Sequence, residues 1–308
     1  MTDTAIAARG LTKRFGKLVA LDGLDLDVPR GASLGILGPA GAGKSTLLRL
    51  LAGLFRPTAG TLTVHGARAG SVAARRRMGV LLQEGQLYDW MSVREALAFA
   101  ADLAVVGVAE MPARIADVAA RLSVEDVLEK RAASLDGPTR GRVAVAQALV
   151  GNPDLLVLDE PFARLSPEGR RDVLAVLAAL RGTVTIVLAA QRAPDVEALC
   201  GRLAVLDAGR ITLAASMPDL AHRVPRAFVL ETRSEGSPAL DGLIARLRSE
   251  PWVIDVAVTG GTLRVVVADE AIAGRELLAA AVDARVPVAA FRREPQSIEG
   301  LVAGLPRS

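Results

Sequence analysis

Short, continuous apolar runs separate longer amphipathic segments along the first two thirds of the chain. One such run is "ASLGILG" at 32–38, and others lie at 154–160, 183–190 and 202–209. An apolar run of this length next to Gly, Asp or Glu is typical of a strand that is buried on both faces of a parallel sheet. The pattern therefore predicts four buried strands.

Helical periodicity appears between these predicted strands. Leu47, Leu48, Leu51 and Leu54 recur at helical spacing after the first run, and residues 166–181 contain another helix pattern. A strand, a glycine-rich loop and a helix in this order begin a parallel α/β unit. The first 30 residues instead alternate short apolar runs with turns, which predicts an antiparallel hairpin region.

The middle of the chain is predicted to be helical and the end to be a separate domain. Residues 92–150 read as mostly helical, with a capping box at 92–95. After residue 226 the composition changes, and an amphipathic helix is followed by two alternating strands joined at Gly260-Gly261. We therefore expect an α/β domain over residues 1–222 and a small α+β domain over residues 228–308.

Composition agrees with a globular protein. Of the 308 residues, 51% are hydrophobic and 23% are charged, with a net charge of +3, whereas disorder needs less apolar content and more net charge. Arg75-Arg76-Arg77 is interpreted as a solvated turn before a strand. Aromatic residues make up 3% of the chain, too few for a base-stacking surface, so no nucleic-acid partner is expected.

Location is also constrained by composition. The single cysteine, Cys200, permits no intrachain disulfide and fits a reducing cytosol. The longest candidate membrane stretch, residues 96–109, contains Asp102 and is shorter than the roughly 20 residues that a membrane span needs. The first residues lack the pattern of a signal peptide. Any membrane connection is therefore expected to come through a partner.

The loop "GPAGAGKST" at 38–46 is the strongest chemical signal. It matches G-x-x-x-x-G-K-[ST], in which glycines let successive backbone N–H groups face an anion and the lysine reaches the β- and γ-phosphates. A chance glycine turn is a poor alternative between a predicted strand and helix. We predict these nucleotide-binding residues in the loop: Gly38, Gly41, Gly43, Lys44, Ser45 and Thr46.

The segment "LLVLDEP" at 155–161 supplies a matching pair of carboxylates. A buried strand brings Asp159 to its carboxyl end, where a metal ion lies beside bound phosphates. Asp159 is therefore expected to hold Mg²⁺, and Glu160 to polarise an attacking water. Ser45 is the second predicted Mg²⁺ ligand.

At this point the chain resembles an ATP-binding subunit of an ABC transporter, over about residues 4–220. Further residues fit that resemblance: Phe15 occupies the position of an aromatic ring that stacks on adenine, and Gln83 that of a glutamine that contacts Mg²⁺ and the water. Residues 84–150 correspond to the helical subdomain. The resemblance implies ATP and Mg²⁺ as cofactors, and a P-loop NTPase core.

The same resemblance implies partners and a location. Together with the glutamine loop, the helical subdomain would receive a cytoplasmic helix of an integral membrane permease, and a second ATP-binding subunit would complete the dimer. The protein would thus lie at the cytoplasmic face of the cell membrane. The C-terminal domain resembles that of the drug- and polyketide-exporter branch, mainly through "EPQSIEGLVAGL" at 294–305.

Three positions depart from the family pattern. In the family, the signature turn reads Leu-Ser-Gly-Gly-Gln and touches the γ-phosphate bound by the other subunit. In this chain the turn reads Leu-Asp-Gly-Pro-Thr. Its residues are Leu135, Asp136, Gly137, Pro138 and Thr139. Asp136 brings negative charge toward a polyanion, and Pro138 lacks a backbone donor. Ser166 replaces an aspartate at the dimer interface, and Gln191 replaces the switch histidine and cannot shuttle a proton.

These departures leave three hypotheses. The chain is an energising exporter subunit that binds ATP and hydrolyses it slowly, with Glu160, Gln83 and Gln191 at the catalytic positions. Alternatively, it is a non-catalytic, ATP-gated partner in a heterodimer. A soluble ABC ATPase of DNA repair or translation is the third, but the coiled coils, zinc cysteines or paired ATP domains of those proteins are missing from the sequence.

Overall fold

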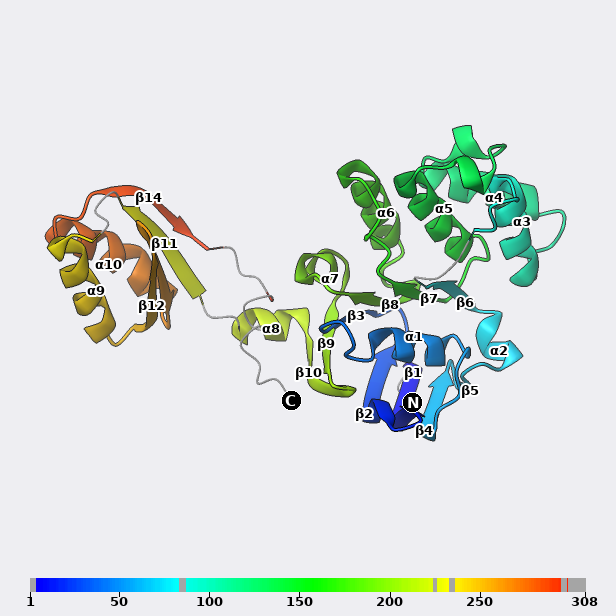
Figure 1. The fold of residues 1–308 in the computed structure, drawn as a ribbon, viewed down its shortest axis with the longest axis horizontal. Helices are drawn as coiled ribbons and strands as arrows, with labels where there is room; N and C mark the ends of the chain where they lie inside the picture. Colours follow the sequence, from blue (N-terminus) through cyan, green and yellow to red (C-terminus); the bar gives the residue numbers. More distant parts are fainter. Residues whose placement is uncertain (1–3, 83–86, 224–225, 233–235, 295–297, 299–308) are drawn as a thin grey trace. The chain divides into compact units, whose positions relative to one another are not determined.

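The computed structural model describes residues 4–82, 87–223, 226–232, 236–294 and 298. They divide into two compact units, with the division between Met217 and Pro218. Each unit has its own buried apolar core, and each is described by itself (Figure 1). The assignment of separate functions to residues 1–222 and 228–308 stays a prediction.

A mixed sheet forms the centre of the first unit, with the strand order β10-β9-β3-β8-β7-β6. All neighbours in it are parallel except the β9–β10 hairpin. Every residue of β3, β7 and β8 is buried, as the apolar runs predicted. The strands are β3 (Ser33–Leu37), β6 (Met78–Leu81), β7 (Leu155–Asp159), β8 (Thr185–Ala190), β9 (Arg202–Asp207) and β10 (Arg210–Ser216).

Helices cover both faces of this sheet. In Figure 1, α1 (Lys44–Leu51) lies between the central sheet and the antiparallel N-terminal sheet, while α6 (Pro167–Ala179) and α7 (Ala193–Leu199) lie on the opposite face. The apolar stripe predicted for α1 was wrong at Leu54, which is 62% exposed. The helix ends before it because Gly53 takes φ +72° and packs against Gly70, where a Cβ would lie 2.1 Å from the Gly70 Cα.

The antiparallel region predicted near the N-terminus is confirmed. Its sheet has the order β2-β1-β4-β5, and its apolar side chains join the core of α1 and the central sheet. The strands are β1 (Thr4–Phe15), β2 (Leu18–Pro29), β4 (Ala59–Val64) and β5 (Ala67–Arg68). A short helix, α2 (Val72–Arg75), leads toward β6, and Arg77 forms an ion pair with Asp154.

The helical subdomain lies between β6 and β7. It contains α3 (Val93–Leu103), α4 (Met111–Arg121), α5 (Gly137–Leu149) and 3₁₀ turns at Glu125–Val127 and Ala132–Ser134. The capping box at the start of α3 is present: the Ser92 hydroxyl accepts the Glu95 N–H at 3.1 Å, and the Glu95 carboxylate accepts the Ser92 N–H at 2.7 Å. Within the described residues, no helix is both long and apolar enough to span a membrane.

The second unit begins with α8 (Met217–Arg223). Its described strands form an antiparallel sheet in the order β12-β13-β11-β14, and two helices pack into one core with it. The chain order βαββαβ with this strand order is the split βαβ arrangement of ferredoxin-like folds. The elements are β11 (Arg226–Thr232), α9 (Pro238–Ser249), β12 (Val253–Thr259), β13 (Thr262–Val267), α10 (Glu270–Asp283) and β14 (Val288–Arg293).

The secondary structure of this unit matches the pattern predicted for it. The hairpin of β12 and β13 turns at Gly260-Gly261, and Gly260 takes φ +57°. The sequence also predicts a short helix at 297–304, and that segment lies almost wholly outside the described residues. The α/β core, the antiparallel N-terminal region, the helical subdomain and the small α+β unit of the predicted fold class are thus all present.

Candidate functional site

The loop between β3 and α1 has a backbone that requires glycine. Gly41 and Gly43 take φ +83° and +104°, which side chains other than hydrogen strain. A Cβ on Gly43 would lie 2.5 Å from the Ala20 carbonyl oxygen, and one on Gly38 would lie 2.1 Å from that of Leu206. No side chain caps the start of α1, so the loop and the helix end fit an anionic phosphate.

Lys44 lies beneath this loop and is only 7% exposed. Its Nζ donates to the carbonyl oxygens of Gly38 and Pro39, at 2.6 and 3.0 Å. Burial lowers the pKa of Lys44, while the negative charges of Glu160 and Asp159 oppose that shift. The lysine is therefore held close to two carboxylates at the end of β7, as the predicted phosphate site requires.

Those carboxylates leave β7 in different surroundings. Asp159, the last residue of the strand, is 2% exposed. Glu160 takes φ +52°, and its N–H donates to the Ala189 carbonyl oxygen on β8 at 2.9 Å. Burial raises the pKa of Glu160, against the lowering effects of Lys44 and of hydrogen bonds with Gln191. A carboxyl group with a raised pKa is suited to proton transfer near neutral pH.

A cavity of about 370 Å³ gathers most of the residues predicted to bind nucleotide. The Phe15 ring stands at its edge and packs edge-on against Phe55, with 5.4 Å between ring centroids. Phe55 was not predicted as part of the site. The cavity is lined by Phe15, Leu18, Val19, Ala20, Ala40, Gly41, Ala42, Gly43, Lys44, Ser45, Thr46, Glu160 and Gln191.

The residues present fit ATP with Mg²⁺. The fit rests on the glycine cradle, which a Cβ would fill, and on a hydroxyl and a carboxylate, hard oxygen ligands of the kind that Mg²⁺ takes. Ser45 lines the cavity and Asp159 ends the strand next to Lys44, so both are placed for the predicted role. Gln83, the third predicted ligand, lies outside the described residues. No residue of the turn at 135–139 is among the residues that line this cavity.

That turn is instead the start of α5, with Asp136 as its N-cap. The Asp136 carboxylate accepts the Thr139 N–H at 2.8 Å. Hydrogen bonds from Thr139, and further off the charge of Arg142, lower the pKa of Asp136, so the cap is an ionised carboxylate. This capping role was not predicted, although Asp directly before a Gly-Pro helix start is a capping signal.

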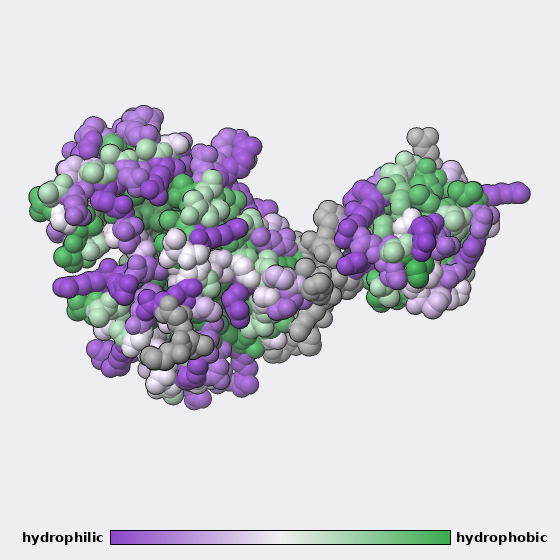
Figure 2. All heavy atoms as spheres, turned by 180° about the vertical axis from the view of Figure 1, so that it is seen from behind, coloured by the Kyte–Doolittle hydropathy of each residue, from purple (hydrophilic) through white to green (hydrophobic). Residues whose placement is uncertain are grey.

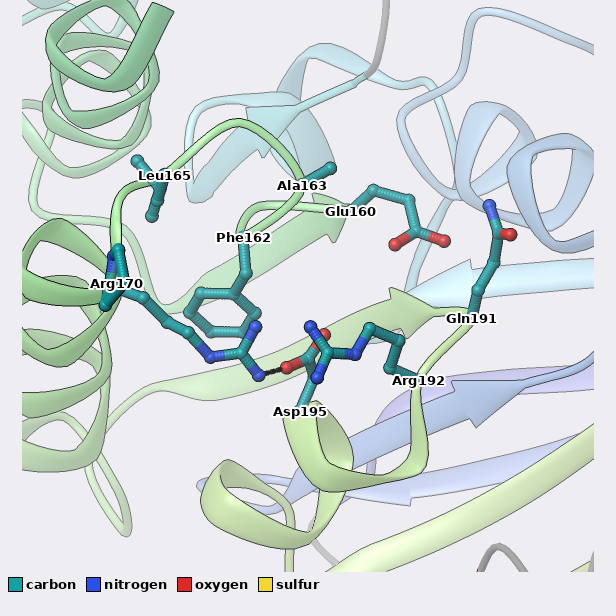
Figure 3. Close-up of a pocket in the computed structure, with 9 residues that line it drawn as sticks. Glu160, Phe162, Ala163, Leu165, Arg170, Gln191, Arg192 and Asp195 are labelled. Atoms are coloured by element: carbon teal, nitrogen blue, oxygen red, sulfur yellow. Dashed lines mark ion pairs between the residues drawn. The ribbon is translucent and has the colours of Figure 1, made fainter.

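Ser166 has a similar structural role at the start of α6. Its hydroxyl accepts the Gly169 N–H at 3.2 Å. The loop that it ends borders a second cavity, of about 530 Å³, which Figure 3 shows. That cavity was not predicted, and it is lined by Glu160, Phe162, Ala163, Leu165, Pro167, Arg170, Gln191, Arg192 and Asp195.

Comparisons with known proteins show the family to which the chain belongs. Residues 21–163 match the model of the family described as ABC transporter. The chain is 37% identical over 223 residues to the daunorubicin resistance ATP-binding protein DrrA3 of Streptomyces coeruleorubidus, covering 71% of each chain. It is 35% identical over 269 residues to the methionine import ATP-binding protein MetN of Caulobacter vibrioides, covering 83% of this chain and 81% of the relative.

Solved structures show the same fold. A structure described as the ATP-binding subunit of an ABC transporter superposes with a TM-score of 0.67 at 23% identity, covering 71% of this chain and 93% of that one. A dimeric structure of the ATP-binding cassette MJ0796 with ADP and Pi superposes with a TM-score of 0.64 at 22% identity, covering 69% and 98%.

The fold and the phosphate-binding loop define the class as a P-loop ATPase cassette. Within that class, the chain belongs to the ATP-binding proteins of ABC transporters. Its relatives include proteins named for drug resistance and others named for import, so family membership leaves the direction of transport open.

Proposed function

We propose that this chain is the ATP-binding subunit of an ABC-type exporter, and that it binds ATP with Mg²⁺ but hydrolyses it slowly. A separate membrane permease would carry the substrate, and the chain would lie at the cytoplasmic face of the membrane as half of an ATP-binding dimer. The name of the drug-resistance relative supports export. Residues 228–308 would stabilise the dimer or regulate it.

The observation that carries the proposal is the contrast between two helix starts. At α1 no side chain caps the helix, and the loop before it stays open to phosphate. At α5 the Asp136 carboxylate already occupies the Thr139 N–H. Pro138 has no N–H, so Gly137 alone among the first three helical residues keeps a donor for an incoming γ-phosphate. The α5 start is therefore a poor receptor for the ATP of a partner subunit.

Gln191 adds to the expected loss of ATP hydrolysis. It interacts with Glu160 and lines both cavities, at the position where the family resemblance places a histidine. A neutral amide can donate a hydrogen bond but cannot carry a proton. Glu160, Gln83 and Gln191 remain the proposed catalytic positions.

The surface of the helical subdomain supports a permease partner. Tyr88, Trp90 and Phe99 are 48%, 64% and 40% exposed, and their rings contact one another, with 4.6 Å between the Tyr88 and Trp90 centroids. Most of the face shown in Figure 2 is hydrophilic, with hydrophobic residues exposed in patches between. Arg140 at the start of α5 donates to Asp89 at 2.6 Å, so a partner seated on these aromatic rings would be linked to the signature turn.

The second candidate function is a non-catalytic, ATP-gated subunit of a heterodimer. It is favoured by the position of the defects, because Asp136 and Pro138 would act on the partner's ATP, whereas the loop at 38–46 serves this chain's own ATP. Steady-state phosphate release by the chain alone and with its permease would separate the two. Transport into inside-out vesicles would test the direction.

Nucleotide binding is the first testable prediction. ATP with Mg²⁺ should raise the melting temperature of the purified chain, since a ligand that binds only the folded state stabilises it by mass action. Lys44→Ala should abolish that rise, whereas Lys130→Ala, a change at an exposed lysine outside the cavity, should keep it. An equal rise in the wild type and in Lys44→Ala would refute the proposed site.

A further inference from the structure

The second cavity is separated from the nucleotide cavity by two side chains. Glu160 and Gln191 line both. In Figure 3 these two side chains face each other at one end of the second cavity, and the guanidinium groups of Arg170 and Arg192 lie farther in. Its volume of about 530 Å³ falls within the roughly 300–1,000 Å³ of small-molecule sites. An ion released beside Glu160 would thus have a space directly behind it.

Arg170 is fixed within this cavity. It forms an ion pair with Asp195, whose side chain is 5% exposed, and its guanidinium lies over the Phe162 ring at 5.3 Å from the centroid. Burial and, to a smaller extent, the charge of Arg192 lower the pKa of Arg170. The positive charge of Arg170 is therefore held rigidly and is balanced by one buried carboxylate.

Arg192 brings a second positive charge that is not balanced. It follows Gln191 after β8 and extends toward the same part of the cavity as Arg170 (Figure 3). Among the residues that the structure describes, no ion pair or side-chain hydrogen bond of Arg192 is found. Two guanidinium groups that share a cavity repel each other, and a bound anion would turn that repulsion into attraction for both.

The remaining charge at the cavity is Glu160. It lies with Gln191 at the other end of the cavity from the two guanidinium groups (Figure 3). Around those groups the lining carries two positive charges, from Arg170 and Arg192, and one negative charge, from Asp195, which is an excess of one positive charge. A small, doubly charged oxyanion fits this arrangement better than a cation or an apolar molecule.

We propose that the second cavity is a binding site for inorganic phosphate, with Arg192 as the principal ligand and Arg170 and Gln191 as supporting donors. The phosphate ion would come from ATP hydrolysis and enter past Glu160 and Gln191. This source of the ion rests on the proposed function, whereas the binding site does not depend on it. Product phosphate would then leave the nucleotide loop without passing back over ADP.

The test is titration of the purified chain with inorganic phosphate alone, followed by ³¹P NMR and calorimetry. We expect wild type to bind and Arg192→Gln to bind at least about tenfold more weakly, the size of effect typical for loss of one charge-assisted hydrogen bond. Arg171→Gln is the matched control, because Arg171 is the next residue on α6 and its side chain is 74% exposed and outside the cavity. It should leave the affinity unchanged.

Lys44→Ala shows in which cavity the phosphate binds. If phosphate binds in the second cavity, this variant keeps the wild-type affinity although it loses ATP. The proposal is overturned if wild type binds no phosphate, if Arg192→Gln binds it as tightly as wild type, or if Lys44→Ala alone abolishes binding. Because the titration needs neither ATP nor turnover, failure of the ATPase proposal and failure of the phosphate site remain distinguishable.

Discussion

At the scale of single residues, two carboxylates near the predicted ATP sites are in opposite environments. Asp136 is exposed, and hydrogen bonds from Thr139 lower its pKa, so it remains charged. Glu160 is half-buried, and burial raises its pKa. The first is a negative charge that caps a helix, and the second is a carboxyl group whose charged form is disfavoured by burial.

Glu160 gives a prediction about stability and pH. Its pKa in the folded chain is raised above the unfolded value of about 4.3, so between those two values the folded state binds more protons. Stability therefore falls as pH rises through that interval, and the ionised carboxylate is a cost at neutral pH. Glu160→Gln should melt at a higher temperature than wild type near neutral pH.

The difference should shrink as the pH is lowered through the raised pKa, because the wild-type carboxyl group then becomes neutral too. Melting curves without nucleotide, from about pH 8 down to the unfolded value of about 4.3, measure it. The control is Glu110→Gln, an exposed glutamate of the helical subdomain, which should show no such trend. A Glu160→Gln variant that is less stable than wild type at every pH would contradict this reading.

At the scale of elements, the proposed function makes the start of α5 the place where this chain would meet a partner's ATP. The cap by Asp136 stabilises the helix because a negative charge lies at its positive end, and the same contact uses a donor that an ATP phosphate would need there. On that proposal, local stability and hydrolysis would compete at this turn.

The double change Asp136→Ser with Pro138→Gly should relieve that competition. A serine can still cap the helix, and a glycine restores the missing N–H. Since one lost transition-state donor costs about 100- to 1000-fold in rate, repair should raise steady-state phosphate release at least several-fold. Adding Gln191→His tests whether the neutral amide limits the rate separately.

The controls for this assay come from the same chain. Glu160→Gln should remove whatever turnover the repaired chain shows. Rapid turnover by wild type that Glu160→Gln abolishes, with no gain from repair, would mean that the altered turn is tolerated and that the chain is an ordinary transport ATPase.

Local signals account for what the sequence could predict about these elements. The apolar runs predicted β3, β7, β8 and β9 because a strand buried on both faces needs no periodicity to be recognised. β10 was missed: it is an edge strand with a weak alternating pattern, and its pairing with β9 depends on a turn at Ala208-Gly209. Elements defined mainly by tertiary neighbours leave little trace in the sequence.

The candidate site likewise has one part that the sequence could predict and one part that it could not. The nucleotide loop is contiguous in sequence, so its residue types and spacing sufficed. The second cavity joins Arg170 on α6 to Arg192 and Asp195 near α7, and these come together only because β7 and β8 are parallel neighbours. The spacing of these residues along the sequence does not predict that they lie close together. The comparisons test none of the individual roles, which stay predictions.

At the scale of the whole molecule, the two units have separate cores, and this predicts the effect of truncation. Ending the chain after Pro225 removes the second unit, whose apolar side chains pack among themselves. ATP binding, measured by the shift in melting temperature, should be retained, because the cavity is built from residues 15–191. Self-association or transport should weaken if the second unit supports the dimer.

The matched control is a full-length chain with exposed surface changes in the second unit, such as Glu276→Gln, which should behave as wild type in both assays. Loss of ATP binding on truncation alone would show that the second unit belongs to the nucleotide site.

The strand order of the second unit also has a mechanical consequence. Its first and last strands, β11 and β14, are antiparallel neighbours, and near their ends the Glu294 N–H donates to the Ala227 carbonyl oxygen at 2.9 Å. The described four-stranded sheet therefore begins and ends at neighbouring positions. A pulling force applied through those two ends would load the hydrogen bonds one after another, like a zipper, and not all at once in shear. The described sheet should therefore yield at low force, beginning from this corner.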